Sequence, residues 1–171
     1  MKTFCLSLAL VAVCSLLIGS VPMAAQSAST LTPGKNGMSA DTDKELARAR
    51  SATARYHDIA QAEAEGYVSF DLYESGEGFH YIKFSLLDGI FDLAQPEMLL
   101  YSPVPGEDRL ELAGVEYLIP MALSPEAPAG FTGDADVWRN DMEGFGLWEL
   151  NVWLWLHNPE GIFGDRNPRV P

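Results

Sequence analysis

The chain is poor in cysteine, and this limits both its covalent structure and its chemistry. Its two cysteines, Cys5 and Cys14, lie within the first 25 residues. If that segment is removed, no disulfide can stabilise the remaining protein and no thiol is left to act as a nucleophile. Stability must then come from a hydrophobic core, which a chain of about 146 residues can form as one domain.

Clustered positive charge is also missing. The chain has 24 Asp and Glu against 11 Lys and Arg, and its formal net charge is −13 at pH 7. Nucleic acids and anionic lipids are bound by groups of Lys and Arg, so we expect the protein to bind neither. The acidic residues are spread along the chain, which is typical of a surface that keeps a secreted protein soluble. The alternative is attraction of cations or basic partners.

Recognised catalytic signatures are absent as well. The chain contains no GxSxG, HExxH, GxGxxG or Walker motif. Residues 133–144 (GDADVWRNDMEG) resemble a calcium loop in composition, but lack the glycine at the sixth position and the glutamate at the twelfth. The sequence therefore indicates no reaction, and whether the protein is an enzyme stays open.

The first 25 residues are organised like a secretory signal peptide. Lys2 supplies positive charge, residues 4–18 are largely apolar, and small residues lead to Ala25. The apolar run is shorter than a membrane span. We expect cleavage after Ala25 or Ala28, a secreted or periplasmic location, and no membrane attachment afterwards. A lipoprotein anchored through Cys14 is the alternative, disfavoured because Val13 occupies the position that needs a small residue.

Residues 26–40 are rich in Ser, Thr and Gly and predict a flexible leader, followed by a single domain over residues 41–171. An amphipathic helix is predicted over residues 41–65. Thr42 and Glu45 form a candidate capping box at its start, and Gly66 is placed to end it.

From Tyr67 onward the apolar period changes to two, which predicts strands. Gly114 is expected to bulge or bend the fourth strand, and residues 121–146 form a long loop rich in Pro and Gly. The five strands are expected over residues 67–73, 79–87, 98–102, 109–120 and 147–157. This pattern favours an α+β domain, in which the N-terminal helix packs on a curved antiparallel sheet of about five strands.

The last predicted strand has two different faces. Trp148, Leu150 and Val152 belong to a wholly apolar face. Exposed aromatic patches are uncommon on monomers, so the tryptophans of the other face predict the wall of a site. That second face mixes aromatic and polar side chains: Glu149, Asn151, Trp153, Trp155 and His157.

Glu116 lies within an otherwise apolar strand, where a carboxylate costs free energy unless it has a partner. His80, His157 or an arginine could supply that partner. Imidazole with carboxylate suits a divalent metal, so His80, Glu116 and His157 are candidate metal ligands, although no pair of histidines has a ligand spacing. The candidate ligand-binding residues are His80, Tyr81, Glu116, Tyr117, Glu149, Asn151, Trp153, Trp155 and His157.

Four segments resemble a family of secreted bacterial hypothetical proteins. They are HY (80–81), PEMLLY (96–101), LAGVEYLIP (112–120) and the Trp-rich WELNVWLWLHNPEGIFGDRNP (148–168). The likeness covers most of residues 56–168, and implies a fold and a secreted location but no reaction. The chain departs from the family pattern in two places. It has Gly78 and Phe79 where the family tends to have Met-Gly, and Asn151 where the family tends to have a histidine. Asparagine cannot take up a proton, which weakens the expectation of catalysis.

Three hypotheses follow for function. The first is a non-enzymatic domain that binds a small apolar or aromatic ligand, with aromatic walls and His80, Glu116 and Asn151 as orienting polar groups. The second is a metal-dependent or acid–base enzyme that uses His80, Glu116 and His157, with a divalent metal as its cofactor. The third is a structural or interaction protein whose aromatic face meets another subunit, such as a second copy in a homodimer.

Overall fold

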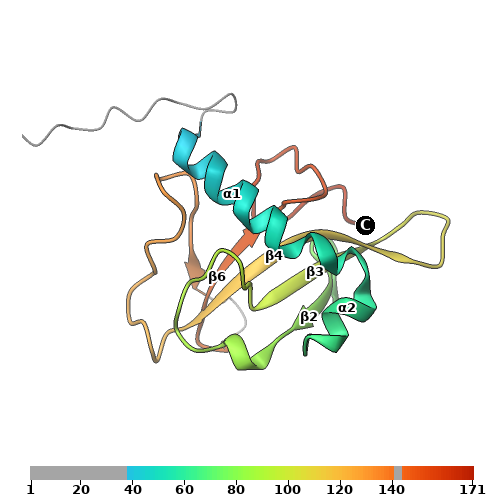
Figure 1. Ribbon diagram of the computed structural model, residues 1–171, viewed down its shortest axis with the longest axis horizontal. Helices are drawn as coiled ribbons and strands as arrows, with labels where there is room; N and C mark the ends of the chain where they lie inside the picture. The colour runs from blue at the N-terminus through green and yellow to red at the C-terminus, as the bar shows by residue number, and fades with distance from the viewer. Residues whose placement is uncertain (1–37, 141–143) are drawn as a thin grey trace, which may run out of the picture. The chain divides into compact units, whose positions relative to one another are not determined.

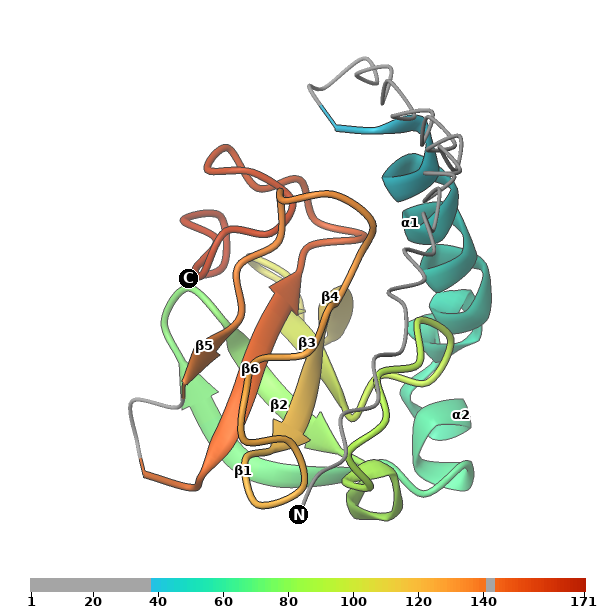
Figure 2. The same ribbon diagram turned by 90° about the vertical axis from the view of Figure 1, so that its left-hand side faces the viewer.

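Six antiparallel strands form one open sheet in the order β1-β2-β3-β4-β6-β5. Figure 1 labels the inner strands β2, β3, β4 and β6, and Figure 2 also labels the edge strands β1 and β5. The computed structural model describes residues 38–140 and 144–171, so the predicted signal peptide and most of the predicted leader lie outside the described residues. The α+β class is confirmed, with six strands instead of five because the short β5 pairs with β6. The strands are β1 Val68–Glu74, β2 Gly78–Ile82, β3 Met98–Pro103, β4 Leu110–Pro120, β5 Arg139–Asn140 and β6 Leu147–Val152.

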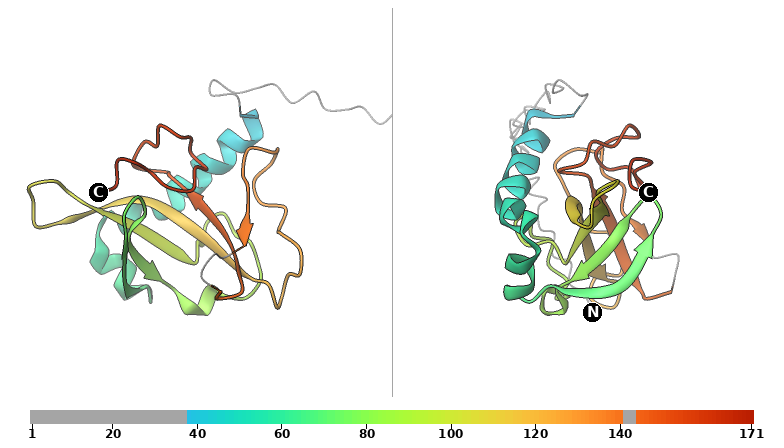
Figure 3. Two further views of the ribbon diagram at one scale, coloured as in Figure 1. Left: turned by 180° about the vertical axis from the view of Figure 1, so that it is seen from behind. Right: turned by 90° about the vertical axis from the view of Figure 1, so that its right-hand side faces the viewer.

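A layer of helices covers one face of the sheet, as Figures 2 and 3 show. It consists of α1 (Ala40–Thr53), the 3-10 turn η1 (Ala54–His57) and α2 (Ile59–Ala64). The predicted single helix is therefore interrupted at Asp58, whose carboxylate accepts a hydrogen bond from the Ala60 amide and caps α2. Among the described residues, no helix has the length and apolarity needed to cross a membrane.

The two ends of this helical segment differ in how well the sequence predicted them. Ser39, not Thr42, is the N-cap of α1, because the Ser39 hydroxyl accepts the Thr42 amide hydrogen. Glu45 instead accepts hydrogen bonds from the amide and hydroxyl of Thr132, so it holds the long loop rather than the helix end. At the other end, Gly66 has a φ of 95° and ends α2 as predicted.

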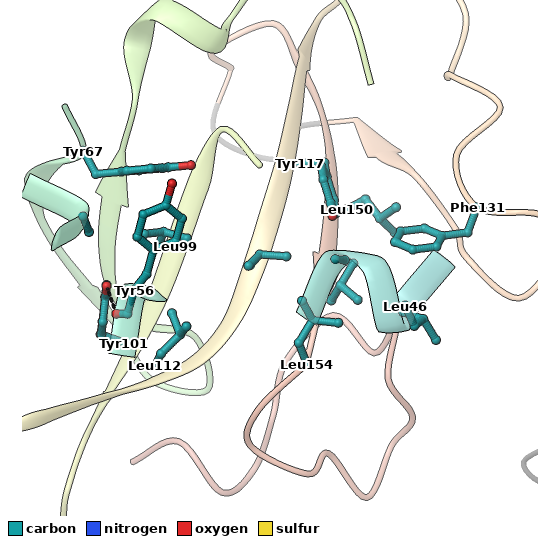
Figure 4. Close-up of a cluster of buried hydrophobic side chains, with 14 residues drawn as sticks. Leu46, Tyr56, Tyr67, Leu99, Tyr101, Leu112, Tyr117, Phe131, Leu150 and Leu154 are labelled. Atoms are coloured by element: carbon teal, nitrogen blue, oxygen red, sulfur yellow. Dashed lines mark hydrogen bonds between the residues drawn. The ribbon is translucent and has the colours of Figure 1, made fainter. Parts of the chain in front are cut away.

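The main core lies between the helices and the sheet (Figure 4). Buried tyrosine hydroxyls in it donate to main-chain carbonyls: Tyr101 to Tyr56 at 2.6 Å and Tyr67 to Pro96 at 2.6 Å. Since an unpaired buried polar group is costly, these bonds let large aromatic rings fill the core. The buried members of the core are Leu46, Ala49, Tyr56, Ala62, Tyr67, Leu99, Tyr101, Leu112, Val115, Tyr117, Phe131, Leu150, Val152 and Leu154.

A bulge in β4 ends the last strand early. The β3–β4 register shifts so that Leu100 faces Gly114 while Tyr101 faces Leu112, as the expectation of a bulge near Gly114 required. The carbonyl of the skipped residue, Ala113, accepts hydrogen bonds from the amides of Trp155 and Leu156. The chain thus leaves the ladder after Val152, and the strand predicted over 147–157 is five residues shorter.

The C-terminal segment, residues 153–171, contributes to the face opposite the helices. Val170 belongs to a second core cluster on that face with Ile82, Met98 and Leu118. Buried side-chain N–H groups hold the irregular backbone of the segment, and this satisfies carbonyls that have no strand partner. These bonds run from Asn151 to the Asp165 carbonyl, Trp153 to Gly164, Asn158 to Arg166 and Asn167 to Leu156, at 2.7–3.1 Å.

Glu97, the residue before β3, makes the stability of the fold dependent on pH. Its side chain is buried, and one carboxylate oxygen accepts the Leu118 amide hydrogen at 3.0 Å. Burial raises the pKa of Glu97 to about 8 from its ordinary 4.5, against that hydrogen bond. The folded state therefore keeps a proton that the unfolded state loses, and this contribution to stability falls as pH rises from about 4.5 to about 8.

We predict that Glu97→Gln flattens this pH dependence. The amide keeps the acceptor for Leu118 and cannot ionise, so the variant should gain about 1.4 kcal/mol over the unmodified protein for each pH unit in that window. Urea unfolding at pH 5, 6, 7 and 8 measures the difference. Glu107→Gln, at an exposed carboxylate, is the matched control and should leave the pH dependence of the unfolding free energy unchanged. An equal pH slope in Glu97→Gln and the unmodified protein would contradict the prediction.

Candidate functional site

A pocket of about 390 Å³ lies on the sheet face opposite the helices. Its strand residues alternate with residues of the main core: Glu116 and Leu118 line the pocket, whereas Val115 and Tyr117 face the helices. All six strands contribute to it, together with the β1–β2 turn, the loop after β2, the connection before β6 and the C-terminal segment. Its lining is Phe70, Leu72, Glu74, Glu77, His80, Ile82, Phe84, Leu87, Met98, Glu116, Leu118, Arg139, Phe145, Leu147, Glu149, Asp165 and Arg166.

The β1–β2 hairpin brings three of these polar residues together. The Glu77 amide donates to the Glu74 carbonyl at 3.0 Å and closes the turn. One ring nitrogen of His80, Nε2, lies 3.4 Å from Glu77 Oε2, and the other, Nδ1, lies 3.3 Å from the Leu72 carbonyl oxygen. One side-chain atom from each of Glu74, Glu77 and His80 lies within 4.8 Å of the other two. The turn therefore converges two carboxylates on one imidazole.

Arg166 joins the C-terminal segment to this hairpin. Its Nη2 lies 3.0 Å from Glu74 Oε2 and 3.5 Å from Glu77 Oε1, and its Nη1 donates to the Ser75 carbonyl at 2.8 Å. The Asn167 amide donates to the Gly76 carbonyl at 2.8 Å. One guanidinium thus compensates both carboxylates and fixes the turn, while half of its side chain stays exposed.

Glu116 is the most isolated charge-bearing group of the pocket. It is 5% exposed, and within residues 38–140 and 144–171 its carboxyl makes no hydrogen bond or ion pair. Burial raises the pKa of Glu116 to about 8, and the nearby His80 opposes that rise. The carboxyl therefore keeps a proton near neutrality, so it can donate a hydrogen bond as well as accept one.

The His80 imidazole has competing influences. Burial disfavours its charged form, but the hydrogen bond to Glu77, the charge of Glu116 and the Leu72 carbonyl outweigh that effect, and the pKa of His80 is raised above its ordinary value. An anionic Glu116 stabilises the imidazolium, and an imidazolium favours ionisation of Glu116. The two groups therefore titrate as a coupled pair rather than independently.

The structure divides the candidate residues among four places. His80, Glu116 and Glu149 line the pocket. Tyr81 and Tyr117 lie on the helix-covered face, where Tyr81 stacks edge-on against Tyr101 and the Tyr117 hydroxyl donates to the Leu93 carbonyl.

The remaining four candidates lie nearer the C-terminal segment. Asn151 and Trp153 hold that segment through their side-chain N–H groups. Trp155 packs edge-on against His57, and His157 is exposed; both line a second cavity. Trp155 and His157 are not on the face of Glu149 and Asn151 because the strand has ended before them. His157 is therefore not brought together with His80 and Glu116.

That second cavity, of about 760 Å³, is the larger of the two and lies between α1 and residues 153–164. Its polar side chains include the exposed His157 and Arg50, whose Nε donates to the Leu154 carbonyl. Of the two cavities, the smaller combines an apolar wall with buried ionisable groups, which is the usual combination at a ligand site. We therefore treat the smaller pocket as the candidate site.

Several site residues were missed from the sequence. Glu74, Glu77 and His80 are spaced three apart in ESGEGFH, but their side chains converge only because a turn over residues 75–77 joins the strands that carry Glu74 and His80. A search for HxH or HxxxH cannot find such a set. Three other charged residues of the pocket, Arg139, Asp165 and Arg166, lie more than fifty residues after the hairpin, and no sequence motif connects them to it. In the structure, Arg139 and Asp165 form an ion pair beside the pocket.

We predict that Gly78→Ala disrupts the hairpin that carries these groups. Gly78 has a φ of 93°, and a Cβ there would lie 2.3 Å from the Tyr101 carbonyl oxygen. The variant should lose about 2–4 kcal/mol of unfolding free energy through backbone strain and the clash. Gly106→Ala has a similar φ of 80° but open space, so it should lose only about 1 kcal/mol. Urea unfolding compares the two, and equal losses would contradict the role of the close approach.

Comparison of this chain with protein-family models, with curated proteins and with solved structures finds no match. Function must therefore be inferred from the chemistry of the pocket itself.

Proposed function

We propose that the protein binds a small apolar or aromatic ligand in the pocket on the sheet face opposite the helices. The observation that carries the proposal is the pocket's division into an apolar wall and a buried polar end. Its volume, about 390 Å³, lies within the range of small-molecule sites, which are mostly apolar with a few placed polar groups.

The apolar wall suits a ligand with a hydrophobic body. Ile82, Met98 and Leu118 are buried at its base. Phe70 and Phe84 stand at its mouth, 41% and 57% exposed, with ring centroids 6.4 Å apart. Large aromatic side chains are usually exposed together where something binds, so a ligand that covered them would remove apolar surface from water.

The polar end suits a ligand that also carries a hydrogen-bonding group. His80 and Glu116 are nearly inaccessible to bulk water and are held by the sheet, so a ligand group meets them already oriented. Because the protonated Glu116 carboxyl can donate or accept a hydrogen bond, it can pair with an acceptor atom or a donor group of the ligand. We therefore expect an amphiphilic small molecule, with its apolar part toward the phenylalanines and its polar part toward the hairpin.

A second candidate function is contact with another subunit. The exposed Phe70, Phe84 and Phe145 favour it, because aromatic side chains are enriched at protein interfaces. Sedimentation of the full chain separates the two candidates. A dimer that is lost when Phe84 is replaced by Ser supports the interface, whereas a monomer at high concentration leaves the pocket mouth to a small ligand.

The neutral dye Nile red tests the ligand proposal. We predict that it binds the full chain with increased fluorescence, and that Leu87→Trp or Leu147→Trp weakens binding at least about tenfold by filling the pocket from two different elements. The matched control is Ile90→Trp, at a residue that is 65% exposed and lines neither cavity. Its affinity should stay within about twofold of the unmodified protein.

Two results would overturn the ligand proposal. One is the absence of saturable dye binding by a folded chain. The other is equal affinity in the two blocking variants and the control, since the dye would then be bound elsewhere. Circular dichroism of each variant establishes that the fold is kept.

A further inference from the structure

We propose that the polar end of the pocket is a binding site for a divalent first-row transition metal ion, held by His80, Glu77 and Glu74. This inference goes beyond the binding of a small apolar ligand and does not require that ligand. It depends on the convergence of the hairpin residues and, separately, on Glu116.

The three ligand atoms are close enough to share one ion. One oxygen from Glu74, one from Glu77 and one ring nitrogen of His80 all lie within 4.8 Å of one another, and His80 Nε2 is already 3.4 Å from Glu77 Oε2. An ion bonded to each at about 2.0–2.2 Å holds its ligand atoms about 3–4 Å apart. A small rotation of the Glu74 side chain, which is only half-buried, would complete that geometry.

The orientation of His80 is the one that a metal ligand needs. Its Nδ1 lies 3.3 Å from the Leu72 carbonyl oxygen, which can only accept a hydrogen bond. With an N–H at Nδ1 bonded to that carbonyl, a metal ion could replace the proton through which Nε2 contacts Glu77. Histidine ligands of metals almost always donate their other N–H to a carbonyl or carboxylate in this way.

Glu116 supplies an independent reason to expect a cation. It is 95% buried, lines the same pocket and makes no hydrogen bond or ion pair within the described part of the chain. A buried carboxylate without a partner is costly, and a divalent ion next to it would stabilise its charged form. Glu116 would then be either a fourth ligand or the counter-charge beside the first three.

Arg166 shows that the carboxylates already attract a cation. Its guanidinium contacts both Glu74 and Glu77 from the exposed side, at 3.0 and 3.5 Å, and keeps the two negative charges together. Since that side chain is half exposed, it can move into solvent, and the bound metal ion would then compensate the charges of Glu74 and Glu77 in its place. His80 and the interior faces of the carboxylates remain for the metal.

The ligand chemistry selects the class of metal. One imidazole nitrogen with two or three carboxylate oxygens suits zinc, iron or manganese, whereas magnesium and calcium prefer an all-oxygen set. We therefore expect Zn²⁺ and Mn²⁺ to bind and Mg²⁺ to bind far more weakly.

Titration of the metal-stripped full chain with Zn²⁺, followed by calorimetry, tests the proposal. Cys5 and Cys14 are replaced by Ser in every variant, because thiolates bind zinc on their own. We expect one Zn²⁺ per chain. His80→Gln and Glu77→Gln should each weaken binding by at least about tenfold, the loss that even the outer partners of a metal ligand cause. Visible absorption of bound Co²⁺ should be lost in the same variants.

The matched controls are His157→Gln and Glu107→Gln, which change an exposed histidine and an exposed carboxylate outside the pocket. Both should keep the affinity within about twofold. If His80→Gln fails to fold, Glu74→Gln takes its place, because that residue is only half-buried. Absence of stoichiometric Zn²⁺ and Mn²⁺ binding, or equal binding in site and control variants, would overturn the proposal. Nile red binding that persists in that case leaves the ligand proposal intact.

Discussion

The bulge at Ala113 and Gly114 is the constraint on which the pocket depends. By shifting the β3–β4 register, it presents the Ala113 carbonyl to the amides of Trp155 and Leu156 and draws the chain out of the ladder after Val152. Only glycine fits at 114, because a Cβ there would lie 2.9 Å from the Val152 carbonyl oxygen. The segment after β6 can then return across the second face of the sheet instead of extending beyond its edge.

That return path places Arg166 beside a hairpin 91 residues earlier in the chain, and it places Asp165 beside Arg139 of β5. It is stabilised by a set of buried side-chain donors rather than by a strand partner, with Asn158 and Asn167 each supplying an amide to a main-chain carbonyl. Such bonds are specific in direction as well as favourable, since the loss of either partner leaves a buried group unsatisfied. The polar end of the pocket is therefore held on both sides, by the β1–β2 turn and by the C-terminal segment.

The two faces of the sheet differ in how their buried polar groups are paired. On the helix side, the buried hydroxyls have partners: those of Tyr67, Tyr101 and Tyr117 donate to main-chain carbonyls, and that of Tyr56 donates to the Glu65 carboxylate. On the other side, ionisable groups are buried against Ile82 and Leu118, and Glu116 has neither a hydrogen bond nor an ion pair within the described residues. A carboxyl in that setting destabilises the fold, and an apolar side chain of the same size would not. Ionisable groups buried in this way are concentrated at functional sites, and this favours the pocket opposite the helices over the larger cavity as the ligand site.

The features of the fold and the pocket that depend on neighbouring residues could be predicted from the sequence, and those that depend on residues far apart in the chain could not. The strand that contains Glu116 matched its prediction within a residue, because its alternation is local and its Gly114 marks a bulge. The isolation of Glu116 among apolar neighbours was likewise visible in the sequence. The end of β6 was not, because it is decided by the Ala113 carbonyl, more than thirty residues away. Strand β5, within the long loop, was also not predicted, because a strand of two residues is too short to show an alternating apolar pattern.

Asn151 is a residue whose role is decided by a hydrogen bond to a distant part of the chain. The alternation of the predicted strand placed Asn151 on the site wall, and in the structure it lies opposite Glu116 in the β4–β6 register. In the structure its amide nitrogen donates to the Asp165 carbonyl at 2.7 Å, while its buried Oδ1 has no hydrogen-bond partner among the described residues. An amide engaged in this way holds the C-terminal segment and cannot exchange a proton. The buried groups of the pocket with raised pKa values are His80 of β2 and Glu116 of β4. The chemistry of the pocket is therefore concentrated at its β2 side, while the tryptophan-rich strand supplies the support that keeps Arg166 over the hairpin.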